Sequence, residues 1–115
     1  MIDWEGIAEL QIARIQRALP APIRIHANQV PVFLERAGRG KNRACLGLFE
    51  GFSLAQGPPA QPDELPRITL FIDALARATN YEEAAFIREV RVTYFHELGH
   101  YLGWDEGQIA QAGLE

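Results

Sequence analysis

The chain has 115 residues, of which 48% are hydrophobic and 23% charged, a composition typical of a compact folded domain rather than a disordered segment. Its net charge of −4 argues against a nucleic-acid-binding module, which is usually basic. No apolar run approaches the roughly 20 residues that crossing a bilayer requires. We therefore expect one domain spanning residues 1–115, located in the cytoplasm, with no nucleic-acid or membrane partner. The sequence does not predict an oligomeric state.

The N-terminal part predicts one helix followed by short strands. Apolar residues recur at helical spacing from Asp3 to Leu19, and the prolines that follow end this helix. Three short runs are then strand-like: Ile23–His26, Val30–Glu35 and Leu46–Phe49.

A turn or flexible loop is predicted at Gly38–Asn42, between the second and third of these runs. Four cations cluster in and around this loop: Arg36, Arg39, Lys41 and Arg43. In an acidic chain such a short cluster is expected to decorate a solvated loop. Cys45 follows as the only cysteine, so neither an intrachain disulfide nor a cysteine-based zinc knuckle is possible.

The middle of the chain predicts a loop, a strand and a short helix. Ser53–Pro66 is rich in proline and is expected to hold little regular structure. Ile68–Ile72 is β-branched and aromatic, which makes it the most strand-like run of the chain. Asp73–Ala78 has the composition of a short helix.

The C-terminal part predicts a long helix and a short one. The long helix begins near Tyr81, with Thr79 or Asn80 as its N-cap, and runs to about Leu102, where Gly103 ends it. Asp105 is placed to cap a last helix that ends at Gly113. The order of elements predicts an α+β fold with a small sheet of three to four strands.

One motif in the long helix carries the chemistry. His96, Glu97 and His100 form the pattern H-E-x-x-H, and residues four apart in a helix point the same way, one turn apart. Two imidazoles in this arrangement can bind one metal ion, and nitrogen ligands favour Zn²⁺ over Mg²⁺ or Ca²⁺. Glu97 lies close enough to act as a general base on water without being a ligand itself. The alternative, that the two histidines are ordinary surface or hydrogen-bonded residues, is less favoured because two of the three histidines occupy this spacing.

A zinc site with an open position needs a third protein ligand. Gly103 allows the chain to turn back under the metal, so either Asp105 or Glu106 could supply a carboxylate oxygen. We favour Glu106, because Asp105 is well placed to cap the final helix.

Other polar and aromatic residues have ordinary structural explanations. Aromatic packing is favoured over a role as oxyanion donor for Tyr94 and Tyr101. A surface or hydrogen-bonded position is favoured over metal binding for His26, and a solvated position over contact with a metal ligand for Glu89. Cys45 is expected to be a small buried hydrophobic residue.

At His96, Glu97, His100, Gly103 and Glu106 the chain resembles the zincin metallopeptidases, and in particular a small bacterial family known as minimal zincins. The family more often has Asp where this chain has Glu106. The resemblance implies a zincin-like fold, Zn²⁺ as cofactor and a peptide or protein substrate. It also implies that an extended peptide pairs antiparallel with the edge strand above the motif helix. As the last strand before that helix, Ile68–Ile72 is the candidate, which makes Ile68, Thr69, Leu70 and Phe71 candidate substrate-binding residues.

Two functional hypotheses follow. In the first, the protein is a zinc-dependent metallopeptidase with His96, His100 and Glu106 as ligands and Glu97 as general base. In the second, it is a zinc-stabilised module that binds a peptide or protein without hydrolysing it, because a chain of 115 residues offers little wall around a substrate. A zinc endoribonuclease with the same histidine spacing is disfavoured, because Glu106 replaces its final histidine and the chain is acidic.

Overall fold

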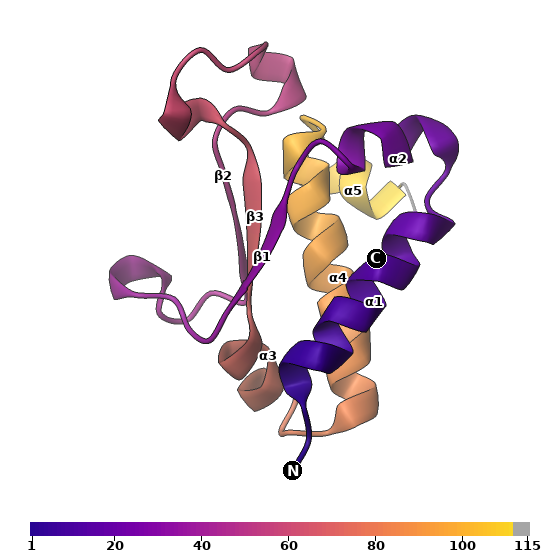
Figure 1. Cartoon of the computed structure of the whole chain (residues 1–115), viewed down its shortest axis with the longest axis vertical. Helices are drawn as coiled ribbons and strands as arrows, with labels where there is room; N and C mark the ends of the chain where they lie inside the picture. The colour runs from indigo at the N-terminus through magenta and orange to yellow at the C-terminus, as the bar shows by residue number, and fades with distance from the viewer. Residues whose placement is uncertain (112–115) are drawn as a thin grey trace.

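The computed structural model describes residues 1–111 as a three-stranded sheet with helices packed on one of its faces (Figure 1). The helices are α1 (Trp4–Ala18), α2 (Ala21–Ala27), α3 (Ile72–Ala78), α4 (Glu83–Tyr101) and α5 (Glu106–Gln111). The strands are β1 (Val32–Glu35), β2 (Gly47–Glu50) and β3 (Arg67–Phe71). This is the expected α+β class with a small mixed sheet.

β3 is the central strand of the sheet, which has the order β1-β3-β2. It pairs in parallel with β1 and antiparallel with β2. The prediction that Ile68–Ile72 forms the exposed edge strand is therefore wrong. Ile68, Thr69, Leu70 and Phe71 are all buried. The prediction took the last strand before the motif helix as the edge, whereas a continuous apolar run is typical of a strand buried on both faces.

The edge strand next to the motif helix is β2. β2 contacts α4, whereas β1 lies at the opposite edge of the sheet (Figure 1). Any strand added to the sheet beside α4 would have to pair with β2 rather than with β3.

The core lies between the sheet and the layer formed by α1 and α4. This core includes Ile12 and Ile15 of α1, Phe86 and Val90 of α4, and Leu70 of β3. α4 is covered by α1 on one side and by β2 and β3 on the other. Its buried surface is therefore wider than the single apolar stripe expected of a surface helix.

The segment Ile23–His26 is helical, so its prediction as a strand is wrong. It belongs to α2, which begins directly after Pro20 and has a proline in its first turn, a position where the fixed φ of proline favours a helix. The β-branched residues suggested a strand, yet Ile25 is exposed. The two prolines before this run were the stronger signal.

The start of the long helix also differs from the prediction. Its N-cap is Glu82, not Thr79 or Asn80. The hydroxyl of Thr79 donates a hydrogen bond to the carbonyl of Leu75 and so closes α3. Asn80 and Tyr81 then both take positive φ angles in the turn between the helices, a conformation that asparagine tolerates better than most residues.

The remaining segments agree with the expectations for them. Two 3₁₀ turns are the only regular structure within Ser53–Pro66. The expected end of the last helix at Gly113 lies outside the described residues. Among residues 1–111, no helix has the length and apolarity needed to cross a membrane.

Candidate metal centre

Two histidines of α4 point to the same side of the helix, as the motif spacing predicts. The ring centroids of His96 and His100 lie 4.8 Å apart, with the rings nearly perpendicular. Both residues are partly exposed and lie near the C-terminal end of α4. Their side chains are therefore accessible to the segment of the chain that follows α4.

Gly103 turns the chain back at the end of α4. Its φ is +81°, which a residue with a side chain adopts only at a cost. Its N–H donates to the carbonyl of His100, and the N–H of Trp104 donates to the carbonyl of Gly99. These two hydrogen bonds are those of a Schellman motif, and they send the chain back along α4 toward the histidines.

The start of α5 is capped, and one buried side chain packs this helix against α4. The Asp105 carboxylate accepts a hydrogen bond from the N–H of Gln108 at 2.8 Å, and the Gln108 side chain accepts one from the N–H of Asp105. Ile109 is fully buried and packs directly over Gly99. This docking leaves Glu106, the first residue of α5, facing the histidines.

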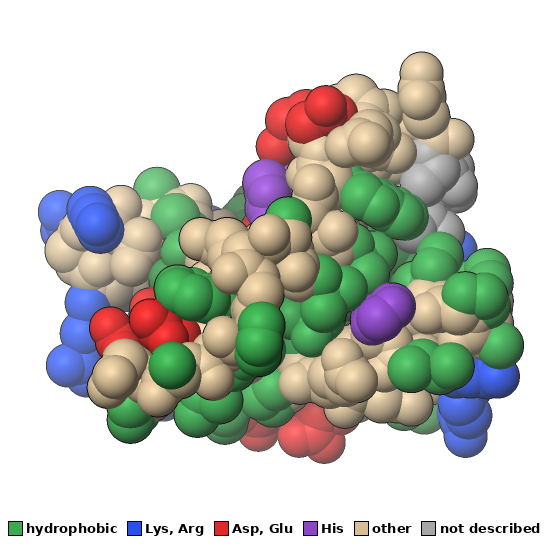
Figure 2. Space-filling view, turned by 90° about the horizontal axis from the view of Figure 1, so that it is seen from above, with side chains coloured by type: hydrophobic (Ala, Val, Ile, Leu, Met, Phe, Trp, Pro, Cys, Tyr) green, Lys and Arg blue, Asp and Glu red, His purple; other side chains and the backbone are tan. Residues whose placement is uncertain are grey.

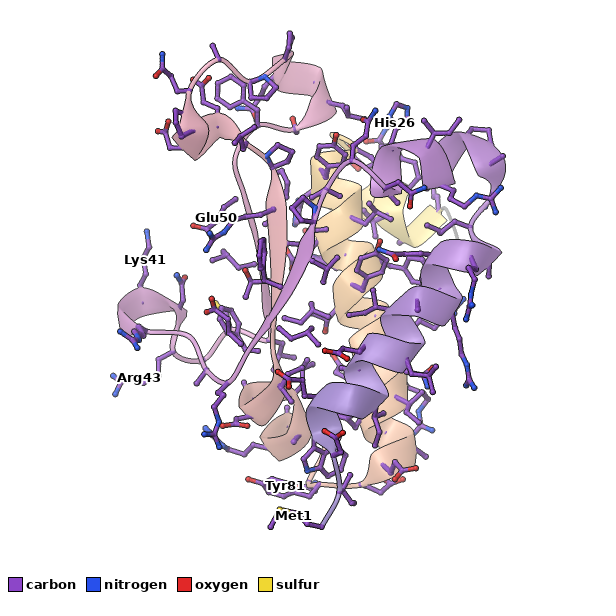
Figure 3. All side chains as sticks on the ribbon, viewed as in Figure 1. Met1, His26, Lys41, Arg43, Glu50 and Tyr81 are labelled. Carbon is purple, nitrogen blue, oxygen red and sulfur yellow. The ribbon has the colours of Figure 1, made fainter. Side chains whose placement is uncertain are left out.

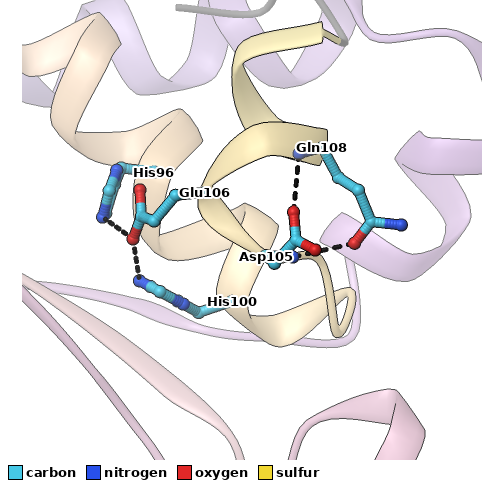
Figure 4. A network of polar contacts seen from close by, with 5 residues as sticks. All are labelled: His96, His100, Asp105, Glu106 and Gln108. Carbon is cyan, nitrogen blue, oxygen red and sulfur yellow. Dashed lines mark hydrogen bonds and ion pairs between the residues drawn. The ribbon is translucent and has the colours of Figure 1, made fainter.

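Figure 4 shows the resulting cluster. Oε1 of Glu106 lies 3.2 Å from Nε2 of His96 and 3.7 Å from Nε2 of His100. One ligand atom from each of the three residues lies within 4.8 Å of the other two. The carboxylate of Asp105 is engaged in the cap instead, so the structure places Glu106 and not Asp105 beside the histidines.

The donor set has the chemistry and spacing of a zinc site. Tetrahedral ligands at roughly 2.0–2.1 Å from an ion lie about 3.4 Å from one another, close to the two separations that involve Glu106. Two imidazole nitrogens and one carboxylate oxygen are typical zinc ligands and leave a fourth position open. His96, His100 and Glu106 therefore could hold a metal ion of this kind.

Glu97 lies between α4 and the edge strand. The backbone N–H of Phe49 in β2 donates a hydrogen bond to its carboxylate. Burial, with a smaller contribution from the negative charge of Glu106, raises the pKa of the Glu97 carboxyl above its usual value against the opposing influence of His100, His96 and the Phe49 N–H. A carboxyl held in this way by an orienting donor is suited to accept and return a proton.

Gly47 allows β2 to approach α4 this closely. A Cβ atom at Gly47 would lie 2.6 Å from Cγ2 of Thr93 and 3.3 Å from Cγ of Glu97. Sequence analysis did not identify Gly47 or Phe49 as contributors to the site. The available signal was the isolated glycine within a strand pattern, which often marks a close backbone approach.

A pocket of about 290 Å³ opens beside His96, Glu97 and the start of β2. Leu46, Val92 and Thr93 line it together with Cys45 and Glu89. Cys45 is therefore part of a pocket wall rather than a fully buried core residue. Glu89 lines this pocket too, and no hydrogen bond or ion pair within the described residues joins it to a histidine.

The hydroxyl groups of the two tyrosines near the motif form hydrogen bonds with residues outside the group of His96, His100 and Glu106. The hydroxyl of Tyr94, which is fully buried, accepts a hydrogen bond from Gln16 of α1. The hydroxyl of Tyr101 donates to Gln29. Burial raises the pKa of both phenols, in line with the packing role expected for them. His26 lies on α2, outside the cluster.

Comparison with protein families identifies the chain. A family model described as zincin-like metallopeptidase matches residues 21–114. The chain belongs to this family. The match covers all three strands and the two helices, α4 and α5, that carry His96, His100 and Glu106. Among the described helices it leaves out only α1. A comparison with curated proteins finds no match.

Proposed function

We propose that this zincin-like metallopeptidase hydrolyses peptide bonds with a zinc ion held by His96, His100 and Glu106. The observation that carries the proposal is the convergence of three donor atoms beside a half-buried carboxyl, Glu97, which is oriented by a backbone N–H. Each element of the arrangement has a separate cause in the sequence: helix periodicity, the Gly103 turn and the capped start of α5.

Zn²⁺ in such a site supplies a Lewis acid that polarises a carbonyl group and lowers the pKa of water toward about 7. Glu97 acts as the general base: its carboxylate accepts the proton of the attacking water. The same carboxyl then donates that proton to the nitrogen of the leaving amine. The Phe49 N–H holds the carboxyl in position during both transfers.

The free side of β2 is the proposed binding place for the peptide. The N–H of Phe71 donates to the carbonyl of Leu46, so alternation along an antiparallel ladder directs the backbone groups of Leu46 and Leu48 toward β3. The backbone groups of Gly47 and Phe49 therefore face the free side. The Phe49 N–H is engaged by Glu97 there, which leaves the N–H and carbonyl of Gly47 and the carbonyl of Phe49 for pairing. An extended peptide that pairs antiparallel with β2 would meet them and lie above the metal cluster.

Substitution of single residues separates metal binding from catalysis. Glu97→Gln is expected to retain about one zinc ion per chain and to lose hydrolysis, because an amide cannot accept the proton; His96→Ala is expected to lose zinc as well. Metal content by mass spectrometry and digestion of a random peptide library, with and without chelator, measure the two properties. Glu83→Gln, an exposed change at the far end of α4, serves as the matched control.

The non-catalytic alternative gives a different result. Zinc bound at one ion per chain with no cleavage of any library peptide would identify a zinc-stabilised binding module. Full cleavage by purified Glu97→Gln would disprove the assigned role of that residue.

A further inference from the structure

The loop between β1 and β2 carries an unusual concentration of positive charge. Residues 36–43 contain four cations and no acidic residue, so seven cations and fifteen acidic residues make up the rest of the chain. The loop therefore carries +4 on a molecule whose remainder carries −8. A local field of this kind attracts acidic groups whatever the net charge of the protein.

Three of these cations are available for a ligand. Arg36 lies 3.6 Å from Asp73, but no ion pair within residues 1–111 involves Arg39, Lys41 or Arg43. All three are exposed. Lys41 and Arg43 point away from the body of the protein (Figure 3).

The loop leads directly into the edge strand, so its position relative to a bound peptide is defined. A peptide antiparallel to β2 has its N-terminal side near Glu50 and its C-terminal side near Gly47, where the loop ends. Seen from above, one group of Lys and Arg side chains lies at the left end of the molecule, across a hollow from a histidine and a group of acidic side chains, and another group lies at the right end (Figure 2). Residues that follow the paired segment would therefore approach the cations.

The other end of β2 has the opposite charge. Glu50 is followed by the segment 51–66, which contains Asp63 and Glu64 and neither lysine nor arginine. Glu50 pairs with Arg67 at 3.1 Å and the two charges offset each other, so the net negative charge at this end comes from Asp63 and Glu64. An acidic side chain on the N-terminal side of a peptide would meet repulsion there, so the two ends of the strand distinguish the direction of an acidic peptide.

We propose that the basic loop 36–43 selects protein substrates that carry acidic residues on the C-terminal side of the scissile bond. The inference rests on the proposed peptidase function and names the class of substrate. Arg39, Lys41 and Arg43 bind the acidic side chains, and the contacts are exposed and sensitive to salt.

Binding to zinc-loaded Glu97→Gln protein tests the inference without turnover. The probes are three fluorescein-labelled peptides that share one core of alternating Thr and Ala. In the first the core is followed by four Asp, in the second it is preceded by four Asp, and in the third it is flanked by Asn. Fluorescence anisotropy is expected to show that the peptide with Asp after the core binds about tenfold more tightly than the peptide with Asp before it. This ratio of dissociation constants is expected to fall toward one in 0.5 M NaCl. Equal binding of the two Asp peptides would overturn the inference.

Charge variants of the loop locate the contact. R39Q/K41Q/R43Q is expected to abolish the preference, whereas R14Q/R17Q/R88Q, which removes three exposed cations elsewhere, keeps it. R39E/K41E/R43E is expected to prefer four Lys after the core, a gain that a misfolded variant would not show. An equal loss in both glutamine variants, or tighter binding of a single-stranded RNA octamer than of the Asp peptide, would overturn the proposal.

Hydrolysis by the unsubstituted protein separates this inference from the proposed function. Cleavage of library peptides without enrichment of acidic residues after the cut overturns the loop's role and leaves the peptidase activity intact. Binding preference without any cleavage overturns the peptidase activity and supports a binding loop.

Discussion

At the scale of single residues, the position of Glu97 depends on a residue with no side chain. Gly47 lets β2 approach α4 until the Phe49 N–H reaches the carboxylate, and the space a methyl group would need is already occupied by Thr93. Thr93 is buried, so it has little freedom to move. The Glu97 carboxyl, the proposed general base, is therefore expected to respond to the packing between strand and helix.

Gly47→Ala tests this dependence. The added methyl group forces β2 away from α4, and overpacking of this kind costs about 1–3 kcal/mol of unfolding free energy. Hydrolysis is expected to fall at least tenfold, because the Phe49 N–H no longer orients Glu97. Urea unfolding and peptide cleavage measure the two effects.

Thr93→Ser is the compensating change, since it removes the methyl group that lies 2.6 Å from the new Cβ. The double variant G47A/T93S is expected to recover most of the stability and activity lost by G47A. A double variant no better than the sum of its two single variants would show that contact with Thr93 is not the cause.

The sequence predicts the site only where local geometry decides it. His96, Glu97 and His100 follow from helix periodicity alone, and the structure places them as that periodicity requires. The choice between Asp105 and Glu106 was open because it depends on the turn at Gly103. The contribution of Phe49 could not be predicted, because it requires a strand distant in sequence to lie beside α4.

At the scale of secondary structure, long periodic elements were predictable and pairing was not. α1 and α4 are found within a few residues of their predicted ends. The identity of the edge strand was mispredicted because strand order is set by tertiary packing, to which a β-branched run such as Ile68–Ile72 gives no clue. α2 was mispredicted because β-branched residues outweighed the proline signal.

The short helix α5 carries the third proposed ligand, and its cap can be tested separately from that ligand. Asp105→Ser keeps an N-cap oxygen but removes the carboxylate, so zinc affinity is expected to change less than twofold. Asp105→Ala removes the cap, worth about 1 kcal/mol, and is expected to weaken zinc binding about fivefold by fraying the start of α5. Glu106→Gln keeps the cap and is expected to weaken zinc binding at least a hundredfold.

Isothermal titration with zinc and a competing chelator measures these affinities. Circular dichroism serves as a control that α4 remains folded in each variant. A hundredfold loss with Asp105→Ser and none with Glu106→Gln would exchange the roles assigned to the two residues.

At the scale of the whole molecule, the group formed by His96, His100 and Glu106 joins two elements that otherwise share few contacts. Within the described residues, α5 contacts mainly α4, and Ile109 is its only buried side chain. α4 is fixed in the core, whereas α5 depends on Ile109, on the Asp105 cap and on whatever joins Glu106 to the histidines. A metal ion there would be a cross-link between the core and the C-terminal helix.

Zinc is therefore expected to stabilise the folded chain and to protect α5 most. At free zinc about 100 times the dissociation constant, binding to the folded state alone contributes about 2.7 kcal/mol, which raises the Tm of a chain of this size by roughly 10 °C. Thermal unfolding with zinc or with chelator measures the shift, and hydrogen exchange is expected to slow in α5 more than in α1. His96→Ala should unfold at the same temperature in both conditions. Zinc that binds at one ion per chain, yet leaves both Tm and exchange in α5 unchanged, would place the ion elsewhere than between α4 and α5.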